Sequence, residues 1–369
     1  MRASQAIAAG LLLPFGAGFP AGALLGGEPQ GAAFDFLNMD MVIRGGGLDW
    51  QGDPNSKLTY TSPSTKWVRN ASGIYVSGTT LRCDHLADGT ALGLLVEGQR
   101  TRDTTHPCNF GNAAWSKTDI TVTDNATAAP DGTTTADLIT EGTAGTAAIQ
   151  QGTTKTTASQ AVSGSIFVKP SANNTWLQVV LGSSGLAEGV NAWVNLSTGA
   201  LGTVSARGSA TLTGASIEAA ANGFYRVYLW ATFSAGAADH TMFVRSASAD
   251  NSTTKVNNSA YYLWHAQVEL GARPSSPIDP ATNSAVTRAA DTVFTLLSQL
   301  PFSTSVGTLI TKIRTPFAVG NQTLVSISDN TTNERFTIRD NAAGIAGLIV
   351  DGGVTQASMV SGLLGTDAT

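Results

Sequence analysis

The chain has 369 residues, only 13% of them charged, and a formal net charge of −5. The scarcity of Glu, Lys and Arg argues against long surface helices, which need such residues on their solvent-exposed face. Nothing in the sequence resembles the basic run of a nucleic-acid-binding protein. The 40 glycines, together with many Thr, Ser, Ala and Asn residues, favour short strands joined by polar turns, and the length suggests two or three domains.

Residues 1–33 form an apolar segment interrupted by Pro14, Pro20 and several glycines, which argues against a membrane-spanning helix. We expect this segment to pack into a groove of another protein or against symmetry mates. A secretory signal peptide and a first strand of the adjacent domain are the alternatives. The large apolar side chains expected to anchor the segment are Leu11, Leu12, Leu13, Phe15, Phe19, Leu24 and Leu25.

Residues 34–107 carry short patterned stretches that predict a small β-rich domain. Gly73 lies between two of these stretches, and Asp88-Gly89 is a strong turn signal, so we expect tight turns at both places.

Two short motifs mirror each other around this region, Cys83-Asp84-His85 and His106-Pro107-Cys108. Four Cys and His ligands suit tetrahedral zinc, but the one-residue spacing departs from the usual knuckle and Pro107 would distort the second half. A disulfide between the cysteines and unlinked, mostly buried thiols are the alternatives. We predict the last of these, with no metal and no cofactor.

Residues 108–272 predict one β-sandwich, because strand-like runs recur at regular spacing with Gly, Asn and Asp between them. The expected strands lie within 120–126, 135–141, 164–170, 175–182, 192–198, 223–235, 240–248 and 261–270. In the sixth, alternate apolar residues are expected to face the core, namely Tyr225, Val227, Leu229, Ala231 and Phe233. Trp115 and Trp264 are expected to seal the core rather than contact a ligand.

Residues 273–290 contain three prolines and predict a linker or a long crossover. Residues 291–369 begin another strand-rich unit. About 80 residues are few for a complete two-sheet sandwich, so we expect this unit to be incomplete and the natural protein to continue.

Three stretches resemble segments of phage tail- and head-fibre proteins. They are LGLLVEGQRT at 92–101, FGNAAWSKTDITVTDNATAAPDGTTTADLITE at 110–141 and YLWHAQVELGARPSSPI at 262–278. Arg102 stands where that family usually has Asn, and His265 where a small residue is commoner. The resemblance covers roughly residues 50–291 and continues through AVTRAAD at 285–291.

The resemblance implies an all-β fold in which 108–272 is a jelly-roll-like sandwich similar to a carbohydrate-binding module. The unit at 291–369 resembles the start of a concanavalin/laminin-G-like sandwich, so tandem β-sandwiches are expected. A virion fibre or spike, usually a homotrimer, is the implied assembly. Residues 1–33 would attach it to a portal, neck, capsid or tail component, and its distal part would meet a host-surface glycan.

The sequence holds no G-x-S-x-G, H-E-x-x-H or P-loop motif, and no solenoid repeat, so we do not expect an enzyme. Two alternatives stay open, a tailspike depolymerase with its catalytic part beyond residue 369 and a secreted bacterial carbohydrate-binding protein. Sugar stacking needs the apolar face of Trp or Tyr beside polar groups. The candidates are Trp176, Trp193, Tyr228 and Trp230, for which packing in a core or subunit interface is the competing interpretation.

Overall fold

The structure is a computed structural model that describes part of the chain in detail. The described residues are 5–6, 31–35, 40–45, 48–52, 56, 58–81, 83–154, 159–234, 239–295, 322–328, 333, 335–341 and 344–360. All seven side chains that we expect to anchor residues 1–33 lie outside these ranges, so that expectation stays a prediction.

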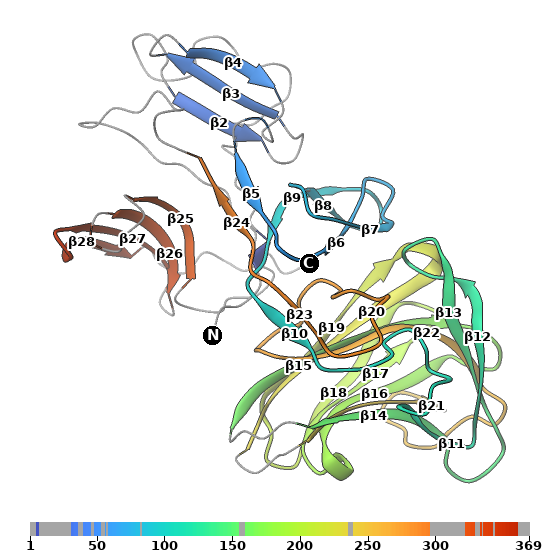
Figure 1. Ribbon diagram of the computed structural model, residues 1–369. Coiled ribbons are helices and arrows are strands. Elements are labelled where there is room, and N and C mark those ends of the chain that lie inside the picture. The colour runs from blue at the N-terminus through green and yellow to red at the C-terminus, as the bar shows by residue number, and fades with distance from the viewer. Residues whose placement is uncertain are drawn as a thin grey trace.

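Two six-stranded antiparallel sheets face each other and form the sandwich (Figure 1). The first, called the β15 sheet, contains in spatial order β12 (Ile120–Ala128), β13 (Thr134–Glu141), β22 (Ala260–Leu270), β15 (Gln160–Pro170), β20 (Phe224–Phe233) and β19 (Thr211–Ala220). The second, called the β16 sheet, contains β11 (Ser116–Thr118), β14 (Ala148–Thr154), β21 (Asp239–Ala247), β16 (Trp176–Ser183), β17 (Gly189–Asn195) and β18 (Ala200–Arg207). The predicted sandwich and its eight expected strands are confirmed, and β11, β14, β18 and β19 are additional.

The core of the sandwich lies between the two sheets. Val227, Leu229, Ala231 and Phe233 of β20 are at most 2% exposed there, and Tyr225 packs against them, which confirms the predicted core face. Trp115 lies in the same core. Strand alternation therefore leaves the other side chains of each strand on the outer faces.

A small β unit packs on the outer face of the β15 sheet. It contains β5 (Thr59–Thr61), β6 (Lys66–Arg69), β7 (Tyr75–Gly78), β8 (Cys83–His85), β9 (Ala91–Val96) and β10 (Arg100–Arg102). Tyr75 meets Phe167 edge-on at 5.4 Å between ring centroids, and Phe167 meets Trp264 at 5.0 Å. Trp264 is fully buried as predicted, but in this second core rather than between the sheets.

The two predicted turns of the small unit are confirmed. Gly73 and Gly89 have φ of +73° and +86°, and each donates its N–H to the carbonyl three residues earlier, Asn70 and Leu86. The left-handed backbone explains the glycines, since other residues adopt it at a cost.

The segment 273–290, expected to be a linker or a long crossover, is packed against the sandwich. Ser275, Pro277 and Ile278 are buried. The segment contains the short strand β23 (Val286–Arg288), which pairs with β10. It is followed by β24 (Thr292–Phe294), which pairs with β5. The returning chain thus pairs with the small unit, an arrangement that proline content alone does not reveal.

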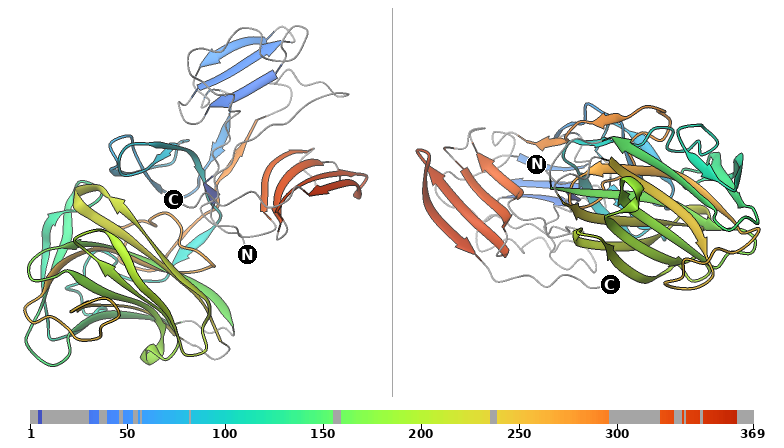
Figure 2. Two further views of the ribbon diagram at one scale, coloured as in Figure 1. Left: turned by 180° about the vertical axis from the view of Figure 1, so that it is seen from behind. Right: turned by 90° about the horizontal axis from the view of Figure 1, so that it is seen from below.

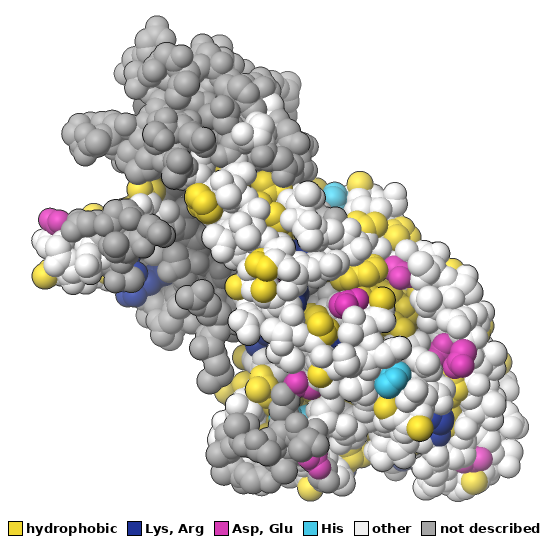
Figure 3. All heavy atoms as spheres, in the orientation of Figure 1, with side chains coloured by type: hydrophobic (Ala, Val, Ile, Leu, Met, Phe, Trp, Pro, Cys, Tyr) yellow, Lys and Arg dark blue, Asp and Glu magenta, His cyan; other side chains and the backbone are white. Residues whose placement is uncertain are grey.

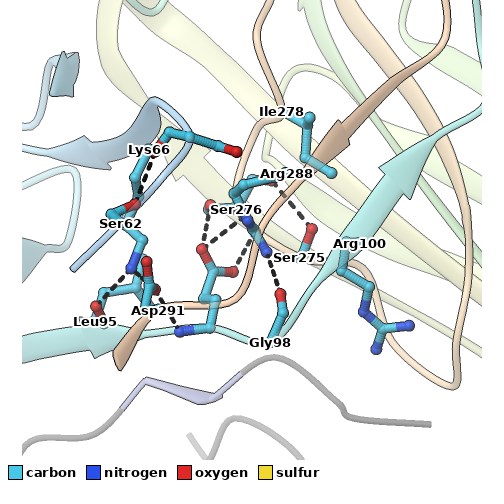
Figure 4. A network of polar contacts seen from close by, with 12 residues as sticks. Ser62, Lys66, Leu95, Gly98, Arg100, Ser275, Ser276, Ile278, Arg288 and Asp291 are labelled. Atoms are coloured by element: carbon cyan, nitrogen blue, oxygen red, sulfur yellow. Dashed lines mark hydrogen bonds and ion pairs between the residues drawn. The ribbon is translucent and has the colours of Figure 1, made fainter. Parts of the chain in front are cut away.

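A buried polar network fastens this returning segment in place (Figure 4). Arg288 Nη1 lies 2.8 Å from Glu97 Oε2 and donates to Ser276 Oγ at 2.7 Å. Lys66 pairs with Asp291 and donates to the Leu95 carbonyl at 3.0 Å. The four ionic side chains of these two pairs are at most 2% exposed. The network ties β6, β9, β23 and β24 into one body.

Two further sheets lie away from the sandwich (Figure 2). One holds β2 (Gly31–Asp35), β3 (Asp40–Gly45) and β4 (Leu48–Gly52), and the other holds β25 (Gln322–Ser328), β26 (Arg335–Asn341), β27 (Gly344–Asp351) and β28 (Val354–Val360). The short β1 (Gln5–Ala6) pairs with β9.

Helical turns such as η2 (Ser184–Leu186) and η3 (Ala221–Gly223) are single 3₁₀ turns. In the part of the chain described, no helix has the length and apolar character to cross a membrane. The predicted all-β class is confirmed.

Candidate functional site

The outer face of the β16 sheet is the candidate site. In β16, Leu177, Val179 and Leu181 point into the core, so Trp176 and Gln178 lie on the outer face. Figure 1 shows the small β unit beyond the opposite sheet, so this face points away from it. Its neighbours β17, β18 and β21 add side chains at matching register.

A row of polar side chains crosses four strands on this face. We call it the polar row, and it consists of Arg245, Gln178, Asn191, Ser205 and Arg207. Arg245 Nε donates to Gln178 Oε1 at 2.7 Å, and Gln178 Nε2 donates to Asn191 Oδ1 at 3.3 Å. Arg207 Nη1 donates to the same Asn191 oxygen at 3.0 Å, and Asn191 Nδ2 donates to Ser205 Oγ at 3.2 Å. The row is therefore continuous from β21 to β18.

The members of the polar row differ in exposure. Gln178 is 2% exposed and Asn191 is 6% exposed, whereas Arg207 and Arg245 are half-buried. The neutral amides form the floor of the face, and a guanidinium stands at each side with surface left for a ligand. Buried amides held by hydrogen bonds have fixed orientations, so they fix the two guanidinium groups that they contact.

Aromatic side chains flank the polar row. Half-buried Trp176 lies two residues before Gln178 on β16. Half-buried Phe243 lies two residues before Arg245 on β21, and the guanidinium carbon of Arg245 is 5.6 Å from its ring centroid. Aromatic faces beside fixed amides and guanidinium groups suit a sugar, whose CH-rich face stacks while its hydroxyls form hydrogen bonds.

The structure divides the four predicted sugar-binding residues between two faces. Trp193 shares the face with Trp176, but it is only 3% exposed and its indole N–H donates to the Ser252 carbonyl at 2.8 Å. We therefore assign Trp193 to packing beneath the 248–254 loop.

Tyr228 and Trp230 lie on the outer face of the β15 sheet, across the sandwich from Trp176. The Tyr228 hydroxyl donates to Glu218, and the guanidinium carbon of Arg273 sits 3.8 Å from the Trp230 ring centroid. Both aromatic side chains are half-buried by protein groups. They do not form one site with Trp176.

The mirrored cysteine and histidine motifs lie on different elements. Cys83 and His85 are on β8, with His85 Nδ1 2.9 Å from the Arg69 carbonyl. Cys108 packs against the Tyr75–Phe167–Trp264 core, where burial raises the pKa of its thiol. Within the described ranges no three His, Cys, Asp or Glu side chains gather in a metal-binding arrangement, and the two thiols are not bonded to each other.

Sequence reasoning missed the polar row. Gln178 and Arg245 occupy outer positions of strands that were predicted, so alternation with core residues was an available signal. Ser205 and Arg207 lie on β18, whose sequence ALGTVSAR is dominated by small residues and gave no strand signal. Only the register of β17 and β18 places Arg207 beside Asn191.

Comparison with known proteins identifies no family. Neither a protein-family model nor a curated protein matches the sequence. A domain of bacteriophage CBA120 tailspike protein 4, described as enzymatically active, aligns with 46% of this chain and 21% of its own at 13% identity and a TM-score of 0.29. The CBM22-1 and GH10 modules of Clostridium thermocellum endo-1,4-β-D-xylanase 10B, complexed with xylohexaose, align with 49% of this chain and 30% of their own at 9% identity and a TM-score of 0.25. The chain thus spans less than a third of either.

Proposed function

We propose that the protein is a non-catalytic fibre or spike subunit of a bacteriophage particle, whose sandwich binds a host-surface glycan on the outer face of the β16 sheet. The observation that carries the glycan-binding part is the placement of half-buried Trp176 and Phe243 beside the polar row. The motifs at 92–101, 110–141 and 262–278 support the assignment to a virion fibre.

Substitution of Trp176 tests the binding face. Trp176→Ala removes the stacking surface and is expected to weaken glycan binding at least tenfold, as measured by microarray and then by calorimetry on the full chain. Trp230→Ala distinguishes the two faces of the sandwich. Loss of binding in Trp230→Ala with retention in Trp176→Ala would place the site on the β15 sheet instead.

Attachment to the particle is proposed to depend on residues 1–33, through a portal, neck, capsid or tail component. A chain lacking residues 1–33 is expected to be absent from purified particles, and incorporation at the normal copy number would contradict this. Cleavage of the chain near residues 24–31 would favour a secreted protein.

The subunit is proposed to assemble as a homotrimer, because fibre modules bury their remaining apolar faces against symmetry mates. Light scattering should give three times the 37.9 kDa chain mass, and a monomer at micromolar concentration would contradict it. Polysaccharide viscosity should stay constant on addition of the protein. A fall would favour the depolymerase alternative.

A further inference from the structure

The two arginines of the polar row differ from Arg69 and Arg288 in the groups that they face. Arg69 and Arg288 each lie within 3.1 Å of a carboxylate, Glu218 and Glu97. No carboxylate of the described residues lies within ion-pair distance of Arg207 or Arg245. Their hydrogen bonds go to neutral oxygens, those of Asn191, Leu186 and Gln178.

Among the described residues the two positive charges therefore have no ion-pair partner, although the protein has a net charge of −5. Figure 3 shows that charged side chains are few on the surface in view and that Asp and Glu are among them. Both guanidinium groups bond to the Gln178–Asn191 pair, so they stand on either side of one short polar stretch. Burial lowers the pKa of Arg245, the carboxylate of Glu141 opposes this effect, and the guanidinium of Arg207 lowers the pKa further.

Each guanidinium retains donors for a ligand. Arg207 uses Nε for the Leu186 carbonyl and Nη1 for Asn191, and Arg245 uses Nε for Gln178. A guanidinium offers a planar fork that matches a carboxylate or phosphate with two parallel hydrogen bonds. Two such groups facing neutral acceptors are expected to favour an anion between them, because it would relieve their mutual repulsion.

We propose that the polar row recognises an acidic sugar residue of a surface polysaccharide. Its anionic group lies between Arg207 and Arg245, and its ring stacks on the neighbouring aromatic side chains. The inference rests on the proposed glycan-binding function and adds the class of ligand. Gln178 and Asn191 would then hold the two guanidinium groups in place beneath the sugar.

The test uses two polymers that differ only in charge, polygalacturonate and its methyl ester, with dextran as a neutral polymer and wall teichoic acid as a phosphate source. Calorimetry on the full chain should show binding to polygalacturonate, at least tenfold weaker binding to the ester, and affinity that falls as salt is raised. Preference for teichoic acid would assign the anion as phosphate, while equal binding to the ester or to dextran overturns the proposal.

Variants separate the failure of this inference from failure of the proposed function. Arg207→Gln and Arg245→Gln should each weaken acidic-glycan binding ten- to a hundredfold, while Arg273→Gln, beside Trp230 on the other face, should bind normally. Circular dichroism verifies that each variant is folded. Loss of binding in Trp176→Ala with no change in the two arginine variants would keep the glycan site and refute the acidic ligand. Absence of binding to all four polymers would refute the acidic ligand, and the glycan microarray would then decide the proposed function.

Discussion

Replacement of Arg288 by Met is expected to destabilise the joint between the small β unit and the sandwich by about 3–5 kcal/mol. The change leaves the Glu97 carboxylate, 2% exposed, without the guanidinium at 2.8 Å. Ser276 would still donate its backbone N–H to Glu97 at 2.9 Å, and Lys66 would remain nearby. A stable domain has about 5–15 kcal/mol in total, so the loss is a large fraction of it.

The pH dependence of this loss follows from the pKa of Glu97. Burial favours the neutral acid, but Arg288, Lys66 and the Ser276 hydrogen bonds outweigh burial and lower the pKa. Wild-type Glu97 thus contributes stability above its unfolded pKa and loses it as the pH falls through the folded value. Without Arg288, burial raises the pKa of Glu97. The stability lost in Arg288→Met should therefore become smaller as the pH falls from 7 to 4.5.

Urea unfolding followed by tryptophan fluorescence measures the effect at both pH values. Arg288→Met combined with Glu97→Gln removes the unpaired buried carboxylate and should recover at least about 2 kcal/mol of the free energy of unfolding. Arg245→Met is the control, since its guanidinium faces a neutral amide, and it should cost less than about 1.5 kcal/mol. A loss below about 1 kcal/mol for Arg288→Met, or a double variant no better than the single one, would refute this account of the joint.

Three further predictions each concern the substitution of one residue. Burial, opposed by hydrogen bonds from the N–H groups of Asn125 and Phe110, raises the pKa of Asp137 to about 6. Between roughly pH 4 and 6 the folded state therefore binds more protons than the unfolded state. The wild-type protein should lose stability relative to Asp137→Asn as the pH rises through this window. A difference between their urea midpoints that does not change with pH would contradict this prediction. Gly132 has φ of +82°, and an added Cβ would meet only Ile74 Cγ2 at 3.8 Å, an ordinary contact. Gly132→Ala should therefore cost about 1 kcal/mol in thermal unfolding through backbone strain, and no loss would exclude such strain at this turn. Fully buried Arg102 donates to the carbonyls of Ile278, Thr282 and Ser284. Arg102→Met should therefore speed hydrogen exchange across residues 278–284. Unchanged protection would show that the stability of this loop does not depend on Arg102.

The sequence by itself determined which segments form the inter-sheet core and where several turns lie. Alternating apolar residues identified β20 and its inward face, and the glycines at 73 and 89 identified turns, because both signals depend on a few neighbouring residues. Strands made of small residues, such as β18, lack the side chains that produce this signal, although their backbones pair equally well.

Tertiary structure alone decided the environment of every polar site. Gln178 and Arg245 are 67 residues apart and meet only because β16 pairs with β21, and Glu97 meets Arg288 only because the chain returns through 273–290. The packing of the two sheets placed Trp176 and Trp230 on opposite faces of the sandwich, and the 248–254 loop covers Trp193. Contacts between distant segments depend on strand register and on the order of strands in a sheet, and neither quantity is encoded in local periodicity.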